Sequence, residues 1–191
     1  MHFDPELHHR RSIRWEGFDY SSSGLYFVTI CTHNREPFLS RIEHGQSIHT
    51  PQGEIVQSAW LAIPERFPVI EFGPFVVMHN HVHGILANAG GASAAQDEKK
   101  EGGASSAPTL GAILRAFKSL SAIAINKRWV KSGKAVWQRN YYEHVIRDGR
   151  EMGIIRRYIL ENPVRWDFDP ENPNAKSQNA RVSWDAIGER G

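Results

Sequence analysis

Two histidines separated by one residue, His81 and His83, lie in an apolar run. In a β-strand alternate side chains face the same side, so both imidazoles would project from one face while Val82 points into the core. Two imidazoles side by side on a rigid strand can hold a divalent metal ion and leave coordination positions open for a substrate. The alternative is an exposed pair of histidines on a solvated strand. His79 falls in the expected turn before this strand and is not counted with the pair.

A second candidate pair lies near the C-terminal end of the sequence. Tyr158 and Asn162 are four residues apart in a segment with helical periodicity, which places them on one helix face. Tyr158 offers a phenol nucleophile and Asn162 a third oxygen ligand for a hard cation. A phenol with a pKa of about 10 needs a nearby cation or base to react at neutral pH. The alternative is that Tyr158 belongs to a packing stripe with Ile155 and Ile159, and that Asn162 only ends the helix before Pro163.

The elements that would position these residues follow from the spacing of apolar positions. It predicts strands at 25–32, 75–78 and 81–86, a strand region at 135–148, and helices at 54–67, 110–128 and 150–161. The two-residue connection His79-Asn80 predicts a tight hairpin. The order β-α-β-β-α-β-α indicates an α+β fold, an antiparallel sheet with helices packed on it, of the split βαβ (ferredoxin-like) kind.

The length of 191 residues fits one domain. We expect this domain to span residues 1–166, with a flexible Ala-, Gly- and Ser-rich insertion at 87–108 and an irregular tail at 167–191. The single cysteine, Cys31, cannot form an internal disulfide and is expected to be a small buried hydrophobe in a protein of a reducing compartment. Without a signal peptide or an 18-residue apolar run, the sequence predicts a cytoplasmic protein with no membrane partner.

The net charge of +2 hides an uneven distribution of charge along the chain. Residues 109–166 contain twelve Lys or Arg against four Asp or Glu, which is a local net charge of +8. Cations interleaved with Trp and Tyr suit the phosphates and unpaired bases of a nucleic acid. The candidates for DNA contacts are Arg115, Lys118, Arg139 and Arg147, with Arg10, Arg11 and Arg14 as an N-terminal arm. For any one of these residues, a solvated surface position is the alternative.

Several segments together resemble the REP-associated tyrosine transposases of the HUH (His-hydrophobic-His) superfamily. They are residues 76–83, 136–147 and 157–163, with further similarity at 26–32 and 110–118, so that the resemblance spans about residues 10–166. The resemblance implies that His81 and His83 bind the metal, that Asn162 completes its site, and that Tyr158 is the catalytic tyrosine. Tyr141 and Tyr142 are rival candidates for the nucleophile, but they match a strand motif of the family instead.

The sequence departs from the family at one position near the proposed site. His79 stands where the family usually has proline. A turn tolerates this exchange, although the additional imidazole beside the site could act as an extra ligand.

The resemblance also implies an activity. It is metal-dependent nicking and strand transfer of single-stranded, hairpin-forming DNA through a 5′-phosphotyrosine intermediate, by a monomer or homodimer. Mg²⁺ or Mn²⁺ is the expected ion because imidazole, amide and phosphate ligands lack the thiolates of a structural zinc site. No small-molecule cofactor is expected. Two other classes stay open: a nucleic-acid-binding module without cleavage, and a metal-dependent hydrolase that uses water in place of Tyr158.

Overall fold

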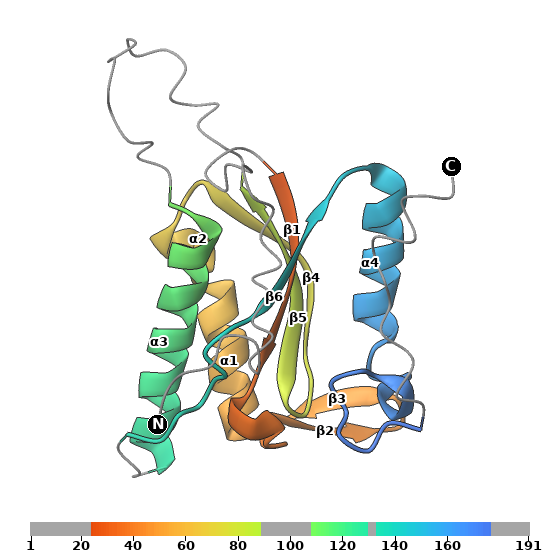
Figure 1. Cartoon of the computed structure of the whole chain (residues 1–191). Helices are drawn as coiled ribbons and strands as arrows, with labels where there is room; N and C mark the ends of the chain where they lie inside the picture. Colours follow the sequence, from red (N-terminus) through yellow and green to blue (C-terminus); the bar gives the residue numbers. More distant parts are fainter. Residues whose placement is uncertain (1–23, 89–107, 130–132, 177–191) are drawn as a thin grey trace, which may run out of the picture.

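A four-stranded antiparallel sheet forms the centre of the protein (Figure 1). The computed structural model describes residues 24–88, 108–129 and 133–176. The strand order is β4-β5-β1-β6, with β1 at Gly24–Cys31, β4 at Ile70–Val77, β5 at His81–Asn88 and β6 at Tyr142–Ile146. Strands β1 and β4 are linked by helices but separated in the sheet by β5, which is the split βαβ arrangement. The predicted α+β fold is confirmed.

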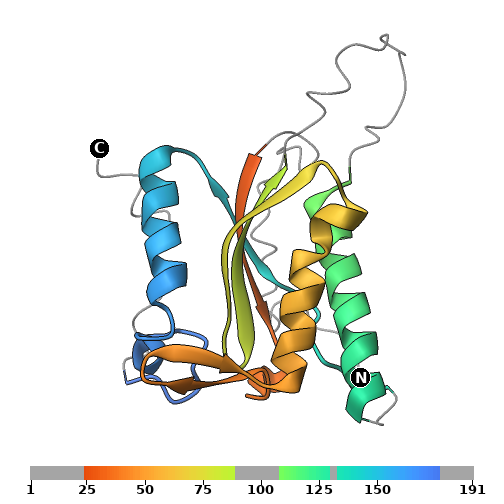
Figure 2. The same ribbon diagram turned by 180° about the vertical axis from the view of Figure 1, so that it is seen from behind.

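Helices cover both faces of the sheet (Figures 1 and 2). Helices α1 (Pro51–Leu61), α2 (Ile63–Arg66) and α3 (Leu110–Trp129) lie on one face, and α4 (Gly149–Glu161) lies on the other. Because successive side chains of β1 point to opposite faces, this strand contributes to the cores on both sides of the sheet. Tyr26 and Val28 belong to the core beneath α1 and α3, whereas Phe27 belongs to a second core with Ile155 and Ile159 of α4.

The sheet approaches α1 closely at one glycine of β5. A Cβ atom on Gly84 would lie 2.3 Å from Cζ2 of Trp60, which is fully buried. Only glycine lets the indole lie directly against the strand. This contact fixes β5 from the side opposite His83, the residue that precedes Gly84.

Four boundaries differ from those expected. The helix expected at 54–67 begins earlier, where the Thr50 side chain accepts from Gly53 N, and is divided at Ala62. The strand at 75–78 extends back to Ile70 through an irregularity between Phe72 and Phe75. Of the strand region at 135–148, only β6 and a bridge between Thr32 and Trp137 pair with the sheet. Of the insertion expected at 87–108, residues 87 and 88 complete β5, and 89–107 lie outside the described residues, as do Arg10, Arg11 and Arg14.

A short hairpin of β2 (Ser40–Glu43) and β3 (Gln46–His49) was not predicted. Its turn residues His44 and Gly45 both have positive φ angles, 51° and 73°. This conformation is usually signalled by Asn-Gly or Asp-Gly, so the sequence lacked the usual mark of such a turn. The hairpin lies at the end of the sheet where β4 turns into β5 (Figure 1).

Other expectations are confirmed. Met78 N donates to the carbonyl of His81 at 2.8 Å, so His79 and Asn80 form the predicted two-residue turn. Cys31 is buried. Two short 3₁₀ helices, η1 (His33–Arg35) and η2 (Trp166–Phe168), complete the described elements. Within the described ranges, no helix is long and apolar enough to cross a membrane.

Candidate active site

Strand β5 places His81 and His83 on the face of the sheet that α4 covers. Their ring centroids are 4.3 Å apart, and the residues are 0% and 2% exposed. Val82 is buried in the opposite core, as the alternation predicted. Because both imidazoles are withdrawn from solvent, they do not form an exposed pair on a solvated strand.

Helix α4 brings Tyr158 to this pair. Its hydroxyl lies 3.3 Å from Nε2 of His83, and the two ring centroids are 5.1 Å apart. The helix begins directly after β6, where the Asp148 side chain caps it by accepting from Glu151 N at 2.8 Å. Buried Ile155 and Ile159 anchor the helix to the sheet. The apolar stripe therefore packs as expected and also fixes where the phenol lies.

Asp169 is a site residue that the sequence analysis missed. Its carboxylate is buried, accepts a hydrogen bond from the Tyr158 hydroxyl at 3.1 Å, and also accepts from the side-chain amide of Asn162. It follows η2, in the segment that was expected to be an irregular tail. The sequence offered one signal, the aromatic residue Trp166 shortly before Asp169. In the structure the ring of Trp166 stacks on that of His81 with centroids 6.0 Å apart, so this segment packs on the sheet.

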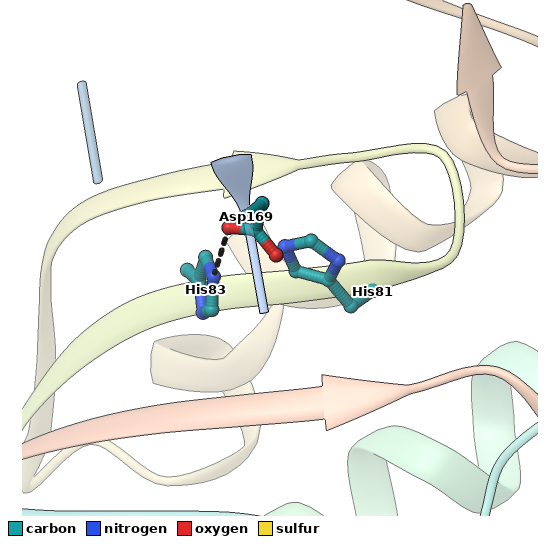
Figure 3. A group of neighbouring side chains, drawn as sticks. All are labelled: His81, His83 and Asp169. Atoms are coloured by element: carbon teal, nitrogen blue, oxygen red, sulfur yellow. Dashed lines mark ion pairs between the residues drawn. The ribbon is translucent and has the colours of Figure 1, made fainter. Parts of the chain in front are cut away.

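His81, His83 and Asp169 form a group that could hold a metal ion (Figure 3). Each offers one ligand atom, and these atoms lie within 4.8 Å of one another. Nε2 of His83 is 3.7 Å from Oδ2 of Asp169. Imidazole and carboxylate ligands without a thiolate are compatible with Mg²⁺ or Mn²⁺.

Two buried atoms beside this group support its fit to a cation. Nε2 of His81 and Oδ1 of Asn162 have no hydrogen-bond partner among the described residues. A buried polar atom without a partner costs about 1–3 kcal/mol, and both atoms carry lone pairs that a cation would satisfy. These residues therefore fit a divalent metal ion.

Burial and neighbouring charges shift the pKa values of two members of this group. Burial, helped by the neighbouring His83, lowers the pKa of His81 well below 6.5, so the imidazole is neutral as a metal ligand must be. Burial disfavours the Asp169 carboxylate, but His83, His81 and the Asn162 amide stabilise it and hold its pKa below the usual range. The site thus combines a neutral His81 imidazole with one buried negative charge.

Tyr158 has the opposite perturbation. Burial, together with the charge of Asp169 and the hydrogen bond to it, raises the pKa of the phenol above its ordinary value of 10. The hydroxyl therefore keeps its proton in this arrangement. A positive charge nearby would be needed to stabilise the phenolate.

The other residues considered near the site are placed differently. Tyr142 lies on β6 with its ring edge-on to Phe27, and Tyr141 packs against the core beneath α1 and α3. Nδ1 of His79 donates to the Ser40 carbonyl at 2.7 Å, and His79 is not part of the group of three.

The four cations expected to contact DNA are not gathered around this site. Arg115 is exposed on α3, on the opposite face of the sheet from α4. Arg147 follows Ile146, which pairs with Leu25 at the far end of β1 from the histidines. Lys118 and Arg139 meet at the loop before β6.

Lys118 has structural partners that the sequence did not reveal. Its Nζ lies 2.5 Å from the carbonyl of Gln138, 2.9 Å from that of Arg139 and 3.5 Å from that of Asn140. Gln138 N in turn donates to the Cys31 carbonyl at 2.9 Å. The ammonium therefore holds the loop to α3, beside the end of β1, while the Arg139 side chain is exposed.

The fold is that of the HUH transposases. A solved REP-associated tyrosine transposase bound to a REP hairpin superposes with a TM-score of 0.56 at 22% identity, covering 81% of this chain and 74% of its own. No family model matches the sequence. The chain is 36% identical to an uncharacterized protein of Haemophilus influenzae over 176 residues, which are 87% of this chain and 95% of that protein. It belongs to the same family as that protein.

Proposed function

We propose that this protein nicks single-stranded, hairpin-forming DNA and transfers the strand, with Tyr158 as the nucleophile. The observation that carries the proposal is the contact between the Tyr158 hydroxyl and the buried His83, 3.3 Å apart, within a group that could hold a metal ion. The shared fold with a transposase bound to a REP hairpin supports DNA as the substrate. The proposed cofactor is Mg²⁺ or Mn²⁺ held by His81, His83 and Asp169, with the amide oxygen of Asn162 as a further ligand.

The proposed reaction exchanges one phosphoester for another. The Tyr158 hydroxyl gives up its proton, and its oxygen forms a bond to phosphorus as the bond from phosphorus to the 3′-oxygen breaks. The 3′-oxygen takes up a proton, so that the products are a 5′-phosphotyrosine and a free 3′-hydroxyl. A second 3′-hydroxyl reverses these steps and joins a new strand. A bound divalent ion would supply Lewis-acid stabilisation of charge on the phosphoryl oxygens.

Aromatic neighbours in the chain orient the proposed nucleophile. Phe27 contacts the Tyr158 ring edge-on, with centroids 6.0 Å apart, and His83 lies against it. The hydroxyl can therefore sample few directions. Helix α4 begins just after β6 ends and packs on the sheet through Ile155 and Ile159, so we propose a nucleophile that acts in cis and a monomer that is sufficient for cleavage.

The DNA strand is proposed to approach along the loop that carries Arg139. Its exposed guanidinium can neutralise a phosphate, while Lys118 supports the loop from behind. Arg115 and Arg147, on another face and at another end of the sheet, would contact flanking phosphates of the hairpin. Binding should weaken with rising salt, as for any protein that neutralises phosphates.

A labelled hairpin oligonucleotide with a single-stranded flank tests the proposal. It is incubated with the wild type, Tyr158→Phe or Tyr142→Phe in Mn²⁺, and denaturing gels are read for a covalent adduct. We expect an adduct with wild type and Tyr142→Phe and none with Tyr158→Phe. Cleavage without an adduct would indicate a hydrolase, and binding without cleavage a nucleic-acid-binding module. Either result, or an adduct with Tyr158→Phe, would overturn the proposal.

A further inference from the structure

We propose that Asn80 is a positioning residue with two roles. Its side chain fixes the tautomer of His81, and it also holds residues 169–171 against the hairpin turn before β5. We call these three residues the strap. The inference rests on the proposed metal site and adds to it a residue that touches neither metal nor DNA. It assigns the orientation of one ligand to a side-chain amide in the hairpin turn before β5.

The Asn80 amide has one possible orientation. Asn80 is fully buried, and its Nδ2 lies 2.8 Å from the carbonyl of Glu171 and 3.3 Å from that of Arg35. Carbonyl oxygens only accept hydrogen bonds, so the amide nitrogen must face them. The amide oxygen therefore faces the other way, toward Nδ1 of His81 at 2.8 Å.

This orientation determines where the His81 proton lies. Because Oδ1 of Asn80 only accepts, Nδ1 of His81 must carry the hydrogen. In a neutral imidazole the other nitrogen, Nε2, then holds a lone pair. Nε2 is the buried atom of His81 that has no partner among the described residues. Asn80 thus presents that lone pair to the metal group, as partners of metal-binding histidines commonly do.

The same amide fastens the strap that carries Asp169. The Glu171 carboxylate pairs with the Arg35 guanidinium at 2.8 Å and accepts from the Cys31 thiol at 3.2 Å. The strap is closed on itself, since Glu171 N donates to Oδ1 of Asp169 at 2.7 Å. Oδ2 of Asp169 remains for the site. The ligand from β5 and the ligand from the strap are therefore joined through Asn80.

The turn that supplies Arg35 is itself held in an uncommon conformation. Asn34 and Arg35 have φ angles of 53° and 55°, in the left-handed region that an arginine seldom adopts. This turn directs the Arg35 carbonyl to Asn80 and its guanidinium to Glu171. One contact orients the Asn80 amide that holds the strap, and the other binds the strap itself. These two contacts can stabilise the uncommon backbone conformation of the turn.

Nitrogen-15 NMR of the imidazoles in the metal-free full chain tests the inference directly. We expect His81, assigned by comparison with His81→Gln, to be the Nδ1–H tautomer in the wild type. Asn80→Ala should produce a mixed or inverted tautomer, whereas Asn80→Asp, which keeps an acceptor facing Nδ1, should preserve it. Asn126→Ala is the matched control, since it removes one side-chain hydrogen bond to a backbone carbonyl far from the site.

Calorimetry with Mn²⁺ gives a second readout. Asn80→Ala should weaken binding by about 10–100-fold, as loss of a ligand's hydrogen-bond partner does elsewhere. A wild-type His81 with its proton on Nε2, or an Asn80→Ala protein that folds with tautomer and affinity unchanged, would overturn the inference. Neither measurement uses DNA, so a wild type that shows the tautomer but forms no adduct would refute the proposed function and leave this inference standing.

Discussion

The Tyr158 hydroxyl donates a hydrogen bond to Oδ2 of Asp169 at 3.1 Å. This contact orients the phenol and helps to keep it protonated, because burial and, after it, the carboxylate raise the pKa of the tyrosine. A cation at the metal group would be attracted to the same carboxylate and would offset its effect on the phenol. With a metal ion bound at that group, the pair would therefore link the protonation of Tyr158 to occupation of the group.

Asp169 should be required for tight metal binding. It contributes the full negative charge of the buried group, so we expect Asp169→Asn to weaken Mn²⁺ binding by at least about tenfold. Calorimetry measures this, with Asp167→Asn as the control, since Asp167 is exposed and pairs with Lys176. Equal affinities for the two variants would remove Asp169 from the ligand set.

Metal-free protein should lose stability in mild acid through His81. The pKa of His81 in the folded protein lies below its value of about 6.5 in the unfolded chain. Between these two values, His81 of the unfolded chain binds a proton that His81 of the folded chain does not. The free energy of unfolding should therefore fall with pH below about 6.5, by up to about 1.4 kcal/mol per pH unit for this one group. Urea titrations from pH 7 to 5 measure the slope. The slope should be shallower in His81→Gln than in the wild type, and unchanged in a variant of the exposed His33. Equal slopes for His81→Gln and the wild type would show that His81 does not cause the loss of stability.

Lys118 should stabilise the loop before β6 rather than serve only as a surface cation. Lys118→Met removes an ammonium that faces three backbone carbonyls. Hydrogen exchange of residues 138–140 should become at least about tenfold faster, which corresponds to about 1.4 kcal/mol of local stability. Lys127→Met, on an exposed position of the same helix, should leave that loop unchanged. If Lys118→Met loses DNA binding and the hydrogen exchange of the loop does not change, Lys118 contacts the DNA directly.

Two glycines should respond in opposite ways to alanine. A Cβ on Gly84 would collide with the Trp60 indole, so Gly84→Ala should lower the free energy of unfolding by about 1–3 kcal/mol. Gly153 is exposed within α4 and has nothing within 4 Å of an added Cβ, so Gly153→Ala should raise it by about 0.5–1 kcal/mol. Denaturant unfolding distinguishes the two, and a neutral Gly84→Ala would show that the indole can move aside.

A nucleophile that acts in cis predicts no rescue between defective chains. Tyr158→Phe and His81→Ala should each be inactive, and their mixture should stay inactive because neither chain holds a complete site. The adduct assay of the mixture measures this. Recovery of about a quarter to half of wild-type activity would indicate that α4 is exchanged between two chains.

Local periodicity in the sequence was sufficient to predict the strands of the central sheet, the helices packed on it and the shared face of His81 and His83. Alternation placed His81 and His83 on one face opposite Val82, and the helical spacing around Tyr158 gave α4 to within one residue. Such patterns depend on neighbours a few residues apart, which the sequence displays directly. The resemblance to the transposases then linked the two segments before any distance between them was known.

Only the tertiary structure revealed Asp169, the role of Asn80 and the partners of Lys118. The carbonyl that Asn80 holds belongs to Glu171, 91 residues away, and the Glu171 side chain meets Cys31 from 140 residues away. An irregular segment has no periodicity that would indicate which surface it returns to. Its place is decided by where the chain reverses after α4 and by which buried donors and acceptors it can satisfy there.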